Sequence, residues 1–445
     1  MAEATMYFPS DFRWGTATAA FQVEGNNYNS DWWAWEEENG RILHNHRSGL
    51  ACNWWENAEA DLDLAADMGT NAHRLSLEWS RIEPEPSVFD YSVLDRYREI
   101  LQAMRDRDIE PMVTLHHFSN PHWLAEKQDF NAPIVVDYFQ RYTAKVVDHL
   151  GDLVAQWVTI NEPMVYIFKR YLEGKFPPPS RPGWLGGLQA GANMLRCHAA
   201  AYHIIKQAYP TAPVGVAKNL ACLDPKPGAG WLARRWAGQL SWLYNEAWLD
   251  CVINGRLRWP FGRGKILGLA GSLDFLGINY YTRFYVKFPP LGGLLEPDWG
   301  AEAIVSDGNY GQIYPEGLYR VIKQALRYDR PIYITENGLP DATDRLRPGF
   351  LMSHLRQVWR AISFCYPVMG YYHWSLIDNF EWDRGWTQRF GLVELDIETQ
   401  ARQLRPSAHL YREICRSGSL NSDMAARYAP DLLPILFPGH VPTPA

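Results

Sequence analysis

Eight short apolar runs, separated by longer stretches, constrain the fold of this 445-residue chain more than any other feature. The runs cover residues 12–21, 72–79, 111–118, 156–163, 213–219, 274–281, 331–338 and 368–376. Near-continuous apolar runs of this length that alternate with helices are typical of parallel strands covered by helices. Eight such units close on themselves, so the sequence predicts an α/β fold, a single (β/α)8 TIM barrel.

Two of the intervening stretches show the spacing of amphipathic helices. Between the fourth and fifth runs, apolar residues recur every three or four positions from Leu188 to Ile205, and Pro210 stops the pattern. Between the first and second runs, the same spacing extends from Ala58 to Met68. It ends at Gly69, a residue type that is common just past a helix.

We expect one domain over residues 1–445, because no serine- or glycine-rich linker interrupts the alternation. A typical barrel has about 250 residues, and the excess falls in segments 24–57, 163–187, 282–312 and 377–400. These segments follow barrel strands, so they should form long loops on the C-terminal face, where barrel enzymes carry their active sites. A proline-rich tail begins at about residue 428. The sequence leaves two arrangements open: the tail packs against the barrel, or it packs against a second subunit in a homo-oligomer.

The charge pattern narrows the classes of partner. The formal net charge is −7 with both signs interspersed, which gives no basic face for nucleic acid or anionic lipid. No apolar stretch reaches about 18 residues, and the N-terminus lacks the pattern of a secretory signal. Six scattered cysteines without a CxxC pair predict reduced packing residues. We therefore expect a cytoplasmic protein that binds neither nucleic acid nor membranes.

Two glutamates close buried strands, Glu162 in TINEP (159–163) and Glu336 in ITENG (334–338). Either one alone is compatible with an ordinary carboxylate at the barrel rim. Together, at the ends of the fourth and seventh strands, they should face one cavity. Glycosidic bond cleavage needs such a pair, one protonated and one ionised. Two like charges about 5 Å apart repel by roughly 3 kcal/mol, or about two pKa units. Arg74 on the second strand is the natural counter-charge for the ionised partner.

Motifs along most of the chain resemble glycoside hydrolase family 1, the retaining β-glucosidase and β-galactosidase family. They run in the family's order from FRWGTATAAFQVEG (12–25) through TINEP and ITENG to WSLIDNFEWDRGWTQRFGL (374–392). The resemblance implies that Glu162 is the general acid/base and that Glu336 is the nucleophile. It further implies that Tyr281 and Arg74 hold the nucleophile ionised and that Trp374 lies under the sugar ring. The residues similar to those that bind sugar hydroxyls are Gln22, His117, Asn161, Glu381 and Trp382.

The implied reaction is that of a retaining exo-β-glycosidase without a cofactor. Its substrates would be small carbohydrates, β-glycosides or oligosaccharides. The enzyme would release a terminal non-reducing β-D-glucosyl residue, and also β-D-fucosyl and β-D-galactosyl residues, through a covalent glycosyl-enzyme. Two branches of the family fit less well. A 6-phosphoglycosidase has a serine and a lysine in the region of Glu381, whose anion would repel a phosphate, and a thioglucosidase has glutamine in place of Glu162.

Each site residue also has a purely structural interpretation. His117 is compatible with a core histidine bonded to backbone. Trp374, Tyr281 and Trp382 are compatible with packing at the top of the barrel. Gln22 and Asn161 are compatible with hydrogen-bonded amides at its rim. His44 and His46 have the spacing of metal ligands, but no pattern of cysteine or acidic partners accompanies them, so we expect no metal.

Two other functions compete with this interpretation. A non-catalytic carbohydrate-binding protein would lack one carboxylate, whereas both are present. An enzyme that transfers the sugar mainly to an alcohol rather than to water shares the glycosyl-enzyme, so the sequence does not distinguish it from a hydrolase.

Some positions depart from the family pattern. Phe118 stands where the family usually has tryptophan, and Ser119-Asn120-Pro121 replaces the usual Asp-Leu-Pro. Segment 30–56 is rich in tryptophan and lacks the usual tyrosine-arginine pair. These changes leave both glutamates in place but weaken any transfer of leaving-group preference from the family.

Overall fold

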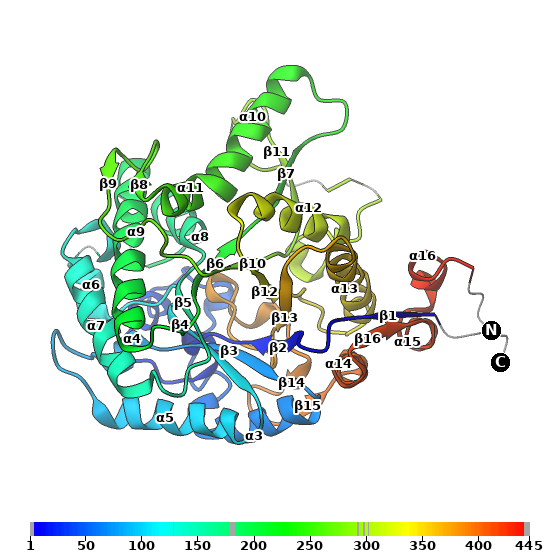
Figure 1. The fold of residues 1–445 in the computed structure, drawn as a ribbon, viewed down its shortest axis with the longest axis horizontal. Helices are drawn as coiled ribbons and strands as arrows, with labels where there is room; N and C mark the ends of the chain where they lie inside the picture. Colours follow the sequence, from blue (N-terminus) through cyan, green and yellow to red (C-terminus); the bar gives the residue numbers. More distant parts are fainter. Residues whose placement is uncertain are drawn as a thin grey trace.

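A closed barrel of parallel strands forms the centre of the protein (Figure 1). The computed structural model describes residues 4–127, 129–177, 183–291, 293–296, 299–300 and 302–439. In chain order the barrel strands are β2 (Arg13–Ala17), β3 (Ala72–Ser76), β4 (Glu110–His116), β5 (Gln156–Asn161), β6 (Val214–Asn219), β10 (Phe275–Asn279), β12 (Ile332–Asn337) and β13 (Val368–Trp374). Each of the eight predicted runs coincides with one of these strands, although β4 begins one residue before its run, so the predicted fold is confirmed.

Four neighbouring barrel strands, β5, β6, β10 and β12, end in asparagine: Asn161, Asn219, Asn279 and Asn337. The register places Asn279 beside Asn219 on one side and beside Glu336 on the other. Amide groups and carboxyl groups therefore share one rim of the barrel, the C-terminal face on which barrel enzymes carry their chemistry.

Helices surround the barrel, and the two predicted ones are confirmed. Of these, α9 (Gly183–Ala208) ends two residues before Pro210, and α3 (Trp54–Asp67) ends just before Gly69. Gly69 has φ +74°, and a Cβ there would lie 2.8 Å from the Arg416 side chain, so both conformation and space favour glycine. The other main helices of the layer are α5 (Tyr91–Arg105), α7 (Val135–Leu150), α12 (Pro315–Ala325), α13 (Arg347–Ser363) and α14 (Pro406–Ser417).

The first apolar run is only partly a strand. β2 stops at Ala17, and a short helix, α1 (Ala20–Val23), begins within the run. The hydroxyl of Ser76 at the end of β3 accepts a hydrogen bond from the Ala20 backbone N–H at 2.8 Å. This bond fixes the turn at which the chain leaves the barrel, and it directs the following residue pair, Phe21 and Gln22, over the rim.

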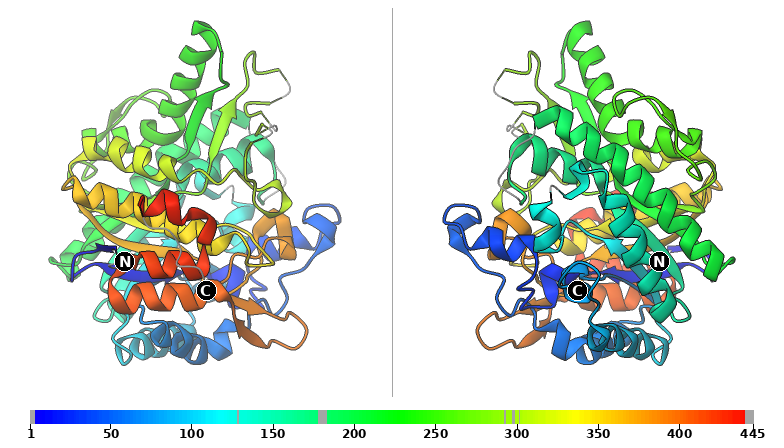
Figure 2. Two further views of the ribbon diagram at one scale, coloured as in Figure 1. Left: turned by 90° about the vertical axis from the view of Figure 1, so that its right-hand side faces the viewer. Right: turned by 90° about the vertical axis from the view of Figure 1, so that its left-hand side faces the viewer.

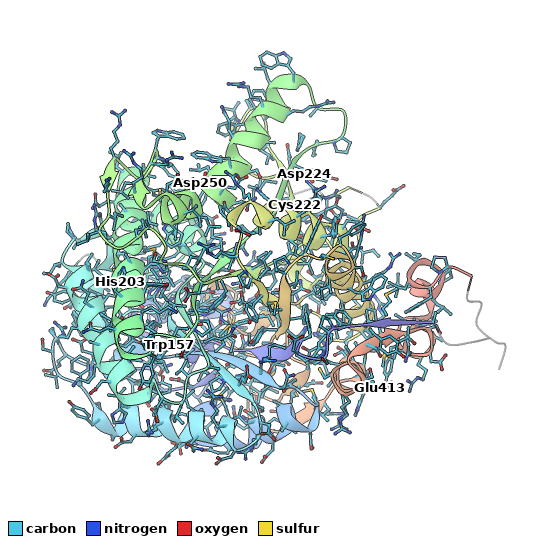
Figure 3. All side chains as sticks on the ribbon, viewed as in Figure 1. Trp157, His203, Cys222, Asp224, Asp250 and Glu413 are labelled. Atoms are coloured by element: carbon cyan, nitrogen blue, oxygen red, sulfur yellow. The ribbon has the colours of Figure 1, made fainter. Side chains whose placement is uncertain are left out.

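A unit after the fifth barrel strand was not among the predicted long segments. It contains β7 (Cys222–Pro225), α10 (Trp231–Ser241), the π-helical turn η4 (Trp242–Glu246) and α11 (Ala247–Asn254). β7 pairs in parallel with β11 (Arg283–Val286) outside the barrel, and α10 projects from the body above this pair (Figure 1). Cys222 and Asp224 lie at the base of the projection, whereas Trp157 lies in the barrel wall (Figure 3). Both carboxylate oxygens of Asp224 accept hydrogen bonds from Arg320 of α12 at 2.7 Å, which ties β7 to the helix layer.

The predicted long loops lie beyond the carboxyl ends of their strands. They contain α2 (Asp31–Glu36), α8 (Pro163–Ile167), the π-helical turn η3 (Phe168–Glu173) and the turn η7 (Trp382–Thr387). Part of the second loop, residues 178–182, and four positions of the third loop lie outside the described residues.

The tail packs against its own chain as far as the structure describes it. α15 (Ser422–Tyr428) and α16 (Leu433–Leu436) lie beside α13 at the edge of the molecule (Figure 2), and Leu433 and Leu436 are buried. The first strand, β1 (Thr5–Tyr7), pairs in antiparallel fashion with the last strand, β16 (Ser419–Asn421). Residues 440–445 of the predicted tail lie outside the described residues. Within the described ranges, no helix is long and apolar enough to cross a bilayer.

Candidate active site

A cavity of about 770 Å³ opens beyond the carboxyl ends of the barrel strands. Its lining includes seven residues that the sequence singled out: His117, Glu162, Tyr281, Glu336, Trp374, Glu381 and Trp382. The other three, Gln22, Arg74 and Asn161, are buried and hydrogen-bond to members of this set. The structure therefore brings all ten predicted residues together in one place.

Glu336, at the end of β12, is held by two donors. The Arg74 guanidinium lies 2.5 Å from Oε1, and the Tyr281 hydroxyl donates to Oε2 at 2.6 Å. Both members of the ion pair are almost fully buried, with side-chain exposures of 1% and 4%. Burial raises the pKa of Glu336, and the charge of Arg74 and the bond from Tyr281 oppose that rise.

Glu162 faces the same cavity with amide partners only. It follows β5 in the left-handed backbone region (φ +44°), and its N–H donates to the Ala217 carbonyl at 2.8 Å. Its Oε1 accepts from the amides of Asn279 (2.8 Å) and Asn219 (3.2 Å). Burial, and then the negative charge of Glu336, raise the pKa of Glu162 to about 8. Since no cation in the described part of the chain forms an ion pair with it, Glu162 keeps its proton at a pH where Glu336 is ionised.

Asn161 links the two carboxyl groups. Its side-chain oxygen accepts hydrogen bonds from Arg74 at 2.7 Å and from Asn279 at 3.1 Å. Its side-chain nitrogen lies 3.1 Å from Nε2 of His117 and donates to it. These contacts fix the orientation of the amide, so Arg74 and Asn279, the partners of the two carboxyl groups, share one rigid anchor.

The inner end of the cavity has unsatisfied polar atoms. The Gln22 amide donates to Oε2 of Glu381 at 2.9 Å, but its own Oε1 is buried and has no partner among the described residues. Nδ1 of His117 is also buried and unpartnered there. Burial lowers the pKa of His117 well below its usual value, so the ring is neutral and Nδ1 is its free N–H. Buried polar atoms of this kind need a partner, and sugar hydroxyl groups both donate and accept.

Aromatic rings enclose this end. The rings of Trp374 and Trp382 both lie nearly parallel to that of His117, with centroids 5.9 and 6.0 Å away and interplanar angles of 23° and 18°. Phe118, which departs from the family's usual tryptophan, packs edge-on against Trp382 at 5.4 Å. The flat faces of a sugar ring suit such walls.

Glu381 differs in charge from the sequence interpretation. Burial raises its pKa to about 8, and the bond from Gln22 lowers it. Burial therefore favours the protonated form of this carboxyl. The argument that an anionic Glu381 repels a phosphate weakens accordingly, and preference for an unphosphorylated sugar stays a prediction.

The sequence reading missed Asn219, Asn279, Tyr244 and Tyr310. The two asparagines obey the strand-end rule that found the glutamates, so the rule could have found them as well. Tyr244 lies on η4 and donates its hydroxyl to Oδ1 of Asn219 at 2.9 Å. Tyr310 lines the cavity from the third long loop. Nothing in the local sequence marks either tyrosine.

The histidines with metal-ligand spacing and the cysteines lie outside this site. Nδ1 of His46 accepts the Trp386 backbone N–H at 3.0 Å, which gives this histidine a packing role. Across the described ranges, no group of three His, Cys, Asp or Glu side chains is placed to hold a metal ion. All six cysteines are free thiols, and five of them are buried.

The outer part of the cavity is apolar on two sides. One wall comes from α8 and η3, and the facing wall comes from the β7–α10–β11 unit and the loop after β11. The apolar lining residues are Val165, Phe168, Leu172, Leu220, Leu223, Leu240, Phe284, Leu294 and Leu295. The unit after the fifth barrel strand, which the sequence did not predict, therefore supplies part of one wall at the mouth of the cavity.

Comparisons with known proteins agree with this geometry. The sequence pattern of glycosyl hydrolase family 1 matches residues 4–419. A β-galactosidase of Sulfolobus acidocaldarius is 32% identical, over 94% of this chain and 96% of the relative. The solved β-glycosidase from Pyrococcus horikoshii superposes with a TM-score of 0.88 at 37% identity, covering 96% and 98% of the two chains. The β-glucosidase from Thermotoga maritima in complex with glucoimidazole gives 0.88 at 28% identity, covering 93% and 100%.

Proposed function

The chain belongs to glycosyl hydrolase family 1, and on that basis we propose that it is a retaining exo-β-glycosidase. In this proposal it removes the terminal non-reducing β-D-glucosyl residue from O-glycosides by double displacement through a covalent glycosyl-enzyme.

One observation carries the proposal, the unequal surroundings of two glutamates in one cavity. Glu336 is paired with Arg74 and bound by Tyr281, whereas Glu162 has only amide donors. An ionised carboxylate opposite a protonated one is the division of labour that a retaining glycosidase needs.

In the first step, a Glu336 carboxylate oxygen attacks the anomeric carbon as the bond to the leaving group breaks. Glu162 donates its proton to the departing oxygen, so an alcohol leaves. In the second step, Glu162 is ionised and takes a proton from water, which attacks the anomeric carbon and releases Glu336. Two inversions at one carbon return the β configuration.

The inner end of the cavity supports a sugar in the pyranose form. The free Oε1 of Gln22, Nδ1 of His117 and Oε1 of Glu381 can together meet hydroxyl groups on one edge of the ring, and Trp374 can lie under its face. Asn161 is already fixed by Arg74 and Asn279, so it can contact the 2-hydroxyl without reorganising. Because Glu381 accepts from hydroxyls at positions 4 and 6, β-fucosides and β-galactosides also enter.

The apolar mouth favours an apolar leaving group. Walls of Phe, Leu and Val side chains on both sides remove aryl or alkyl surface from water, at about 25 cal/mol per Å². A leaving group that bears such surface gains affinity there, and the charged side chains that also line the cavity, Lys169, Glu173, Lys175, Asp383 and Arg384, can meet its polar groups.

A panel of p-nitrophenyl β-glycosides tests the proposal. The panel contains the glucoside, galactoside, fucoside and 6-phosphoglucoside, compared by kcat/KM, and proton NMR follows the configuration of the first-formed sugar. We expect the glucoside to lead, the phosphorylated sugar to be poor, and the β-anomer to appear first. Release of the α-anomer would exclude the double displacement, and preference for the phosphorylated sugar would exclude the substrate assignment.

A further inference from the structure

Lys218, the last residue but one of β6, is a buried lysine that the reaction above does not use. Its side chain has no exposure to solvent. The ammonium donates to the backbone carbonyls of Asn219 and Tyr244, both at 2.7 Å, and lies 4.8 Å from the centre of the Tyr244 ring. Within the described part of the chain, it forms no ion pair. A leucine or methionine would fill the space without the free-energy cost of burying an ammonium group, so its presence requires a reason.

Its two partners lead directly to the acid/base glutamate. The Tyr244 hydroxyl donates to Oδ1 of Asn219 at 2.9 Å, and the Asn219 amide donates to Oε1 of Glu162 at 3.2 Å. By binding the carbonyls of both Asn219 and Tyr244, Lys218 joins η4 to the end of β6. It thereby fixes the two residues that orient one donor to the Glu162 carboxyl.

Lys218 also places positive charge behind that carboxyl. The titratable and charged groups around this point are Glu162 after β5, Glu336 of β12, Tyr244 of η4 and Glu173 of η3. Burial lowers the pKa of Lys218 to about 7, and the charge of Glu162 raises it. The lysine is therefore most strongly charged when Glu162 is ionised, which is its state after the leaving group has departed.

We propose that Lys218 is a positioning residue for the acid/base: it holds the Asn219–Tyr244 pair against Glu162 and favours the ionised carboxylate that activates water. In the second step Glu336 is esterified by the sugar and carries no charge, so burial is what favours protonated Glu162, and the charge of Lys218 opposes that effect. The inference rests on the proposed function of Glu162.

The test is the pH dependence of Lys218→Met, which keeps the volume and removes the charge. We expect the alkaline limb of kcat/KM for p-nitrophenyl β-glucoside to move up, but by less than the unit or more that a fully charged neighbour gives, because the pKa of Lys218 of about 7 leaves it only partly charged where Glu162 titrates. We expect kcat for the dinitrophenyl glucoside, limited by the second step, to fall on the acidic side. Unshifted limbs, or an equal loss of rate at every pH, would overturn the proposal.

Two further variants separate charge from geometry. Tyr244→Phe removes the hydroxyl and leaves the lysine, so rates with poor leaving groups should fall while the limbs move less than in Lys218→Met. Lys206→Met is the control, because Lys206 also donates to two backbone carbonyls, of Pro210 and Ala212, but lies near the amino end of β6, where it forms an ion pair with Asp274 at 2.6 Å. Its pH profile should match that of the wild type.

A direct titration keeps the outcomes distinct. Carbon-13 NMR of glutamate-labelled protein, with Glu162 assigned by Glu162→Gln, should show a higher pKa for Glu162 in Lys218→Met than in the wild type. If the pKa of Glu162 is the same in Lys218→Met as in the wild type, and the wild type hydrolyses β-glucosides, the role of Lys218 is rejected and the proposed function stands. A wild-type protein without hydrolysis would instead reject the proposed function.

Discussion

Removing the charge of Arg74 should shift the pH range in which the enzyme works. In Arg74→Met, Glu336 keeps its burial and its bond from Tyr281 but loses the ion pair at 2.5 Å. With charge centres about 4 Å apart and an effective dielectric near 20, that pair is worth about 4 kcal/mol, or about three pKa units. Water entry and relaxation reduce the effect, and we expect the pKa of Glu336 to rise by about one to three units.

The sign follows from the role of Glu336. The nucleophile must be ionised, so the acidic limb of kcat/KM marks its deprotonation and should move up by the same one to three pH units. On that limb, kcat/KM should fall by about 10- to 1000-fold. The bell-shaped profile should narrow, because the pKa of Glu336 approaches that of Glu162.

The assay is the pH profile of kcat/KM for p-nitrophenyl β-glucoside, measured with two control variants. Arg74→Lys keeps the charge but loses the second donor, which reaches Asn161, so its rate should fall with little movement of the limb. Arg13→Met breaks an ion pair of 2.7 Å with Glu110. Both side chains of that pair are about one-third exposed, at the amino ends of β2 and β4, so this variant should leave the profile unchanged. An acidic limb that stays in place in Arg74→Met would refute the assignment of Glu336 as the residue whose charge Arg74 supports.

Three further outcomes are expected. Glu336→Gly should lose turnover by roughly 10⁴-fold or more, and azide should restore it with the dinitrophenyl glucoside to give the α-glucosyl azide; hydrolysis at the wild-type rate would exclude Glu336. Glu162→Ala should slow alkyl glucosides by roughly 10²- to 10⁴-fold yet spare formation of the glycosyl-enzyme from the dinitrophenyl glucoside, and equal losses for both substrates would count against an acid. The wild-type kcat/KM should fall as the pH rises through about 8, where Glu162 loses its proton. This alkaline limb should disappear in Glu162→Gln, and a limb that remains at the same pH in that variant would assign it to another group.

The sequence predicted the parts of the site that are attached to strand ends. Glu162, Glu336 and Arg74 lie at or within barrel strands, and the period of the apolar runs fixes where those strands end and which face they share. The predicted helices and four of the long loops follow from the same alternation. Asn219 and Asn279 were within reach of this reasoning, because each ends a strand.

The sequence did not predict what depends on contacts outside the barrel. The β7–β11 pair joins Cys222–Pro225 to Arg283–Val286, two segments of 4 residues each that lie about 60 residues apart and are too short to stand out. Tyr244 reaches Asn219 from a π-helical turn, and no local pattern marks such a turn. Lys218 looks like a polar interruption of an apolar run, and only the fold shows that it is buried. The charge of Glu381 likewise depends on burial rather than on its motif.

Trapping the intermediate tests the central claim most directly. A 2-deoxy-2-fluoro-β-glucoside with a dinitrophenyl leaving group forms the glycosyl-enzyme faster than water releases it, and mass spectrometry of the peptides then locates the sugar. We expect one fluoroglucosyl group per chain on Glu336, formed with a burst of dinitrophenol and absent in Glu336→Gly. A label on Glu162 or on any other residue, or hydrolysis without a covalent adduct, would contradict the account.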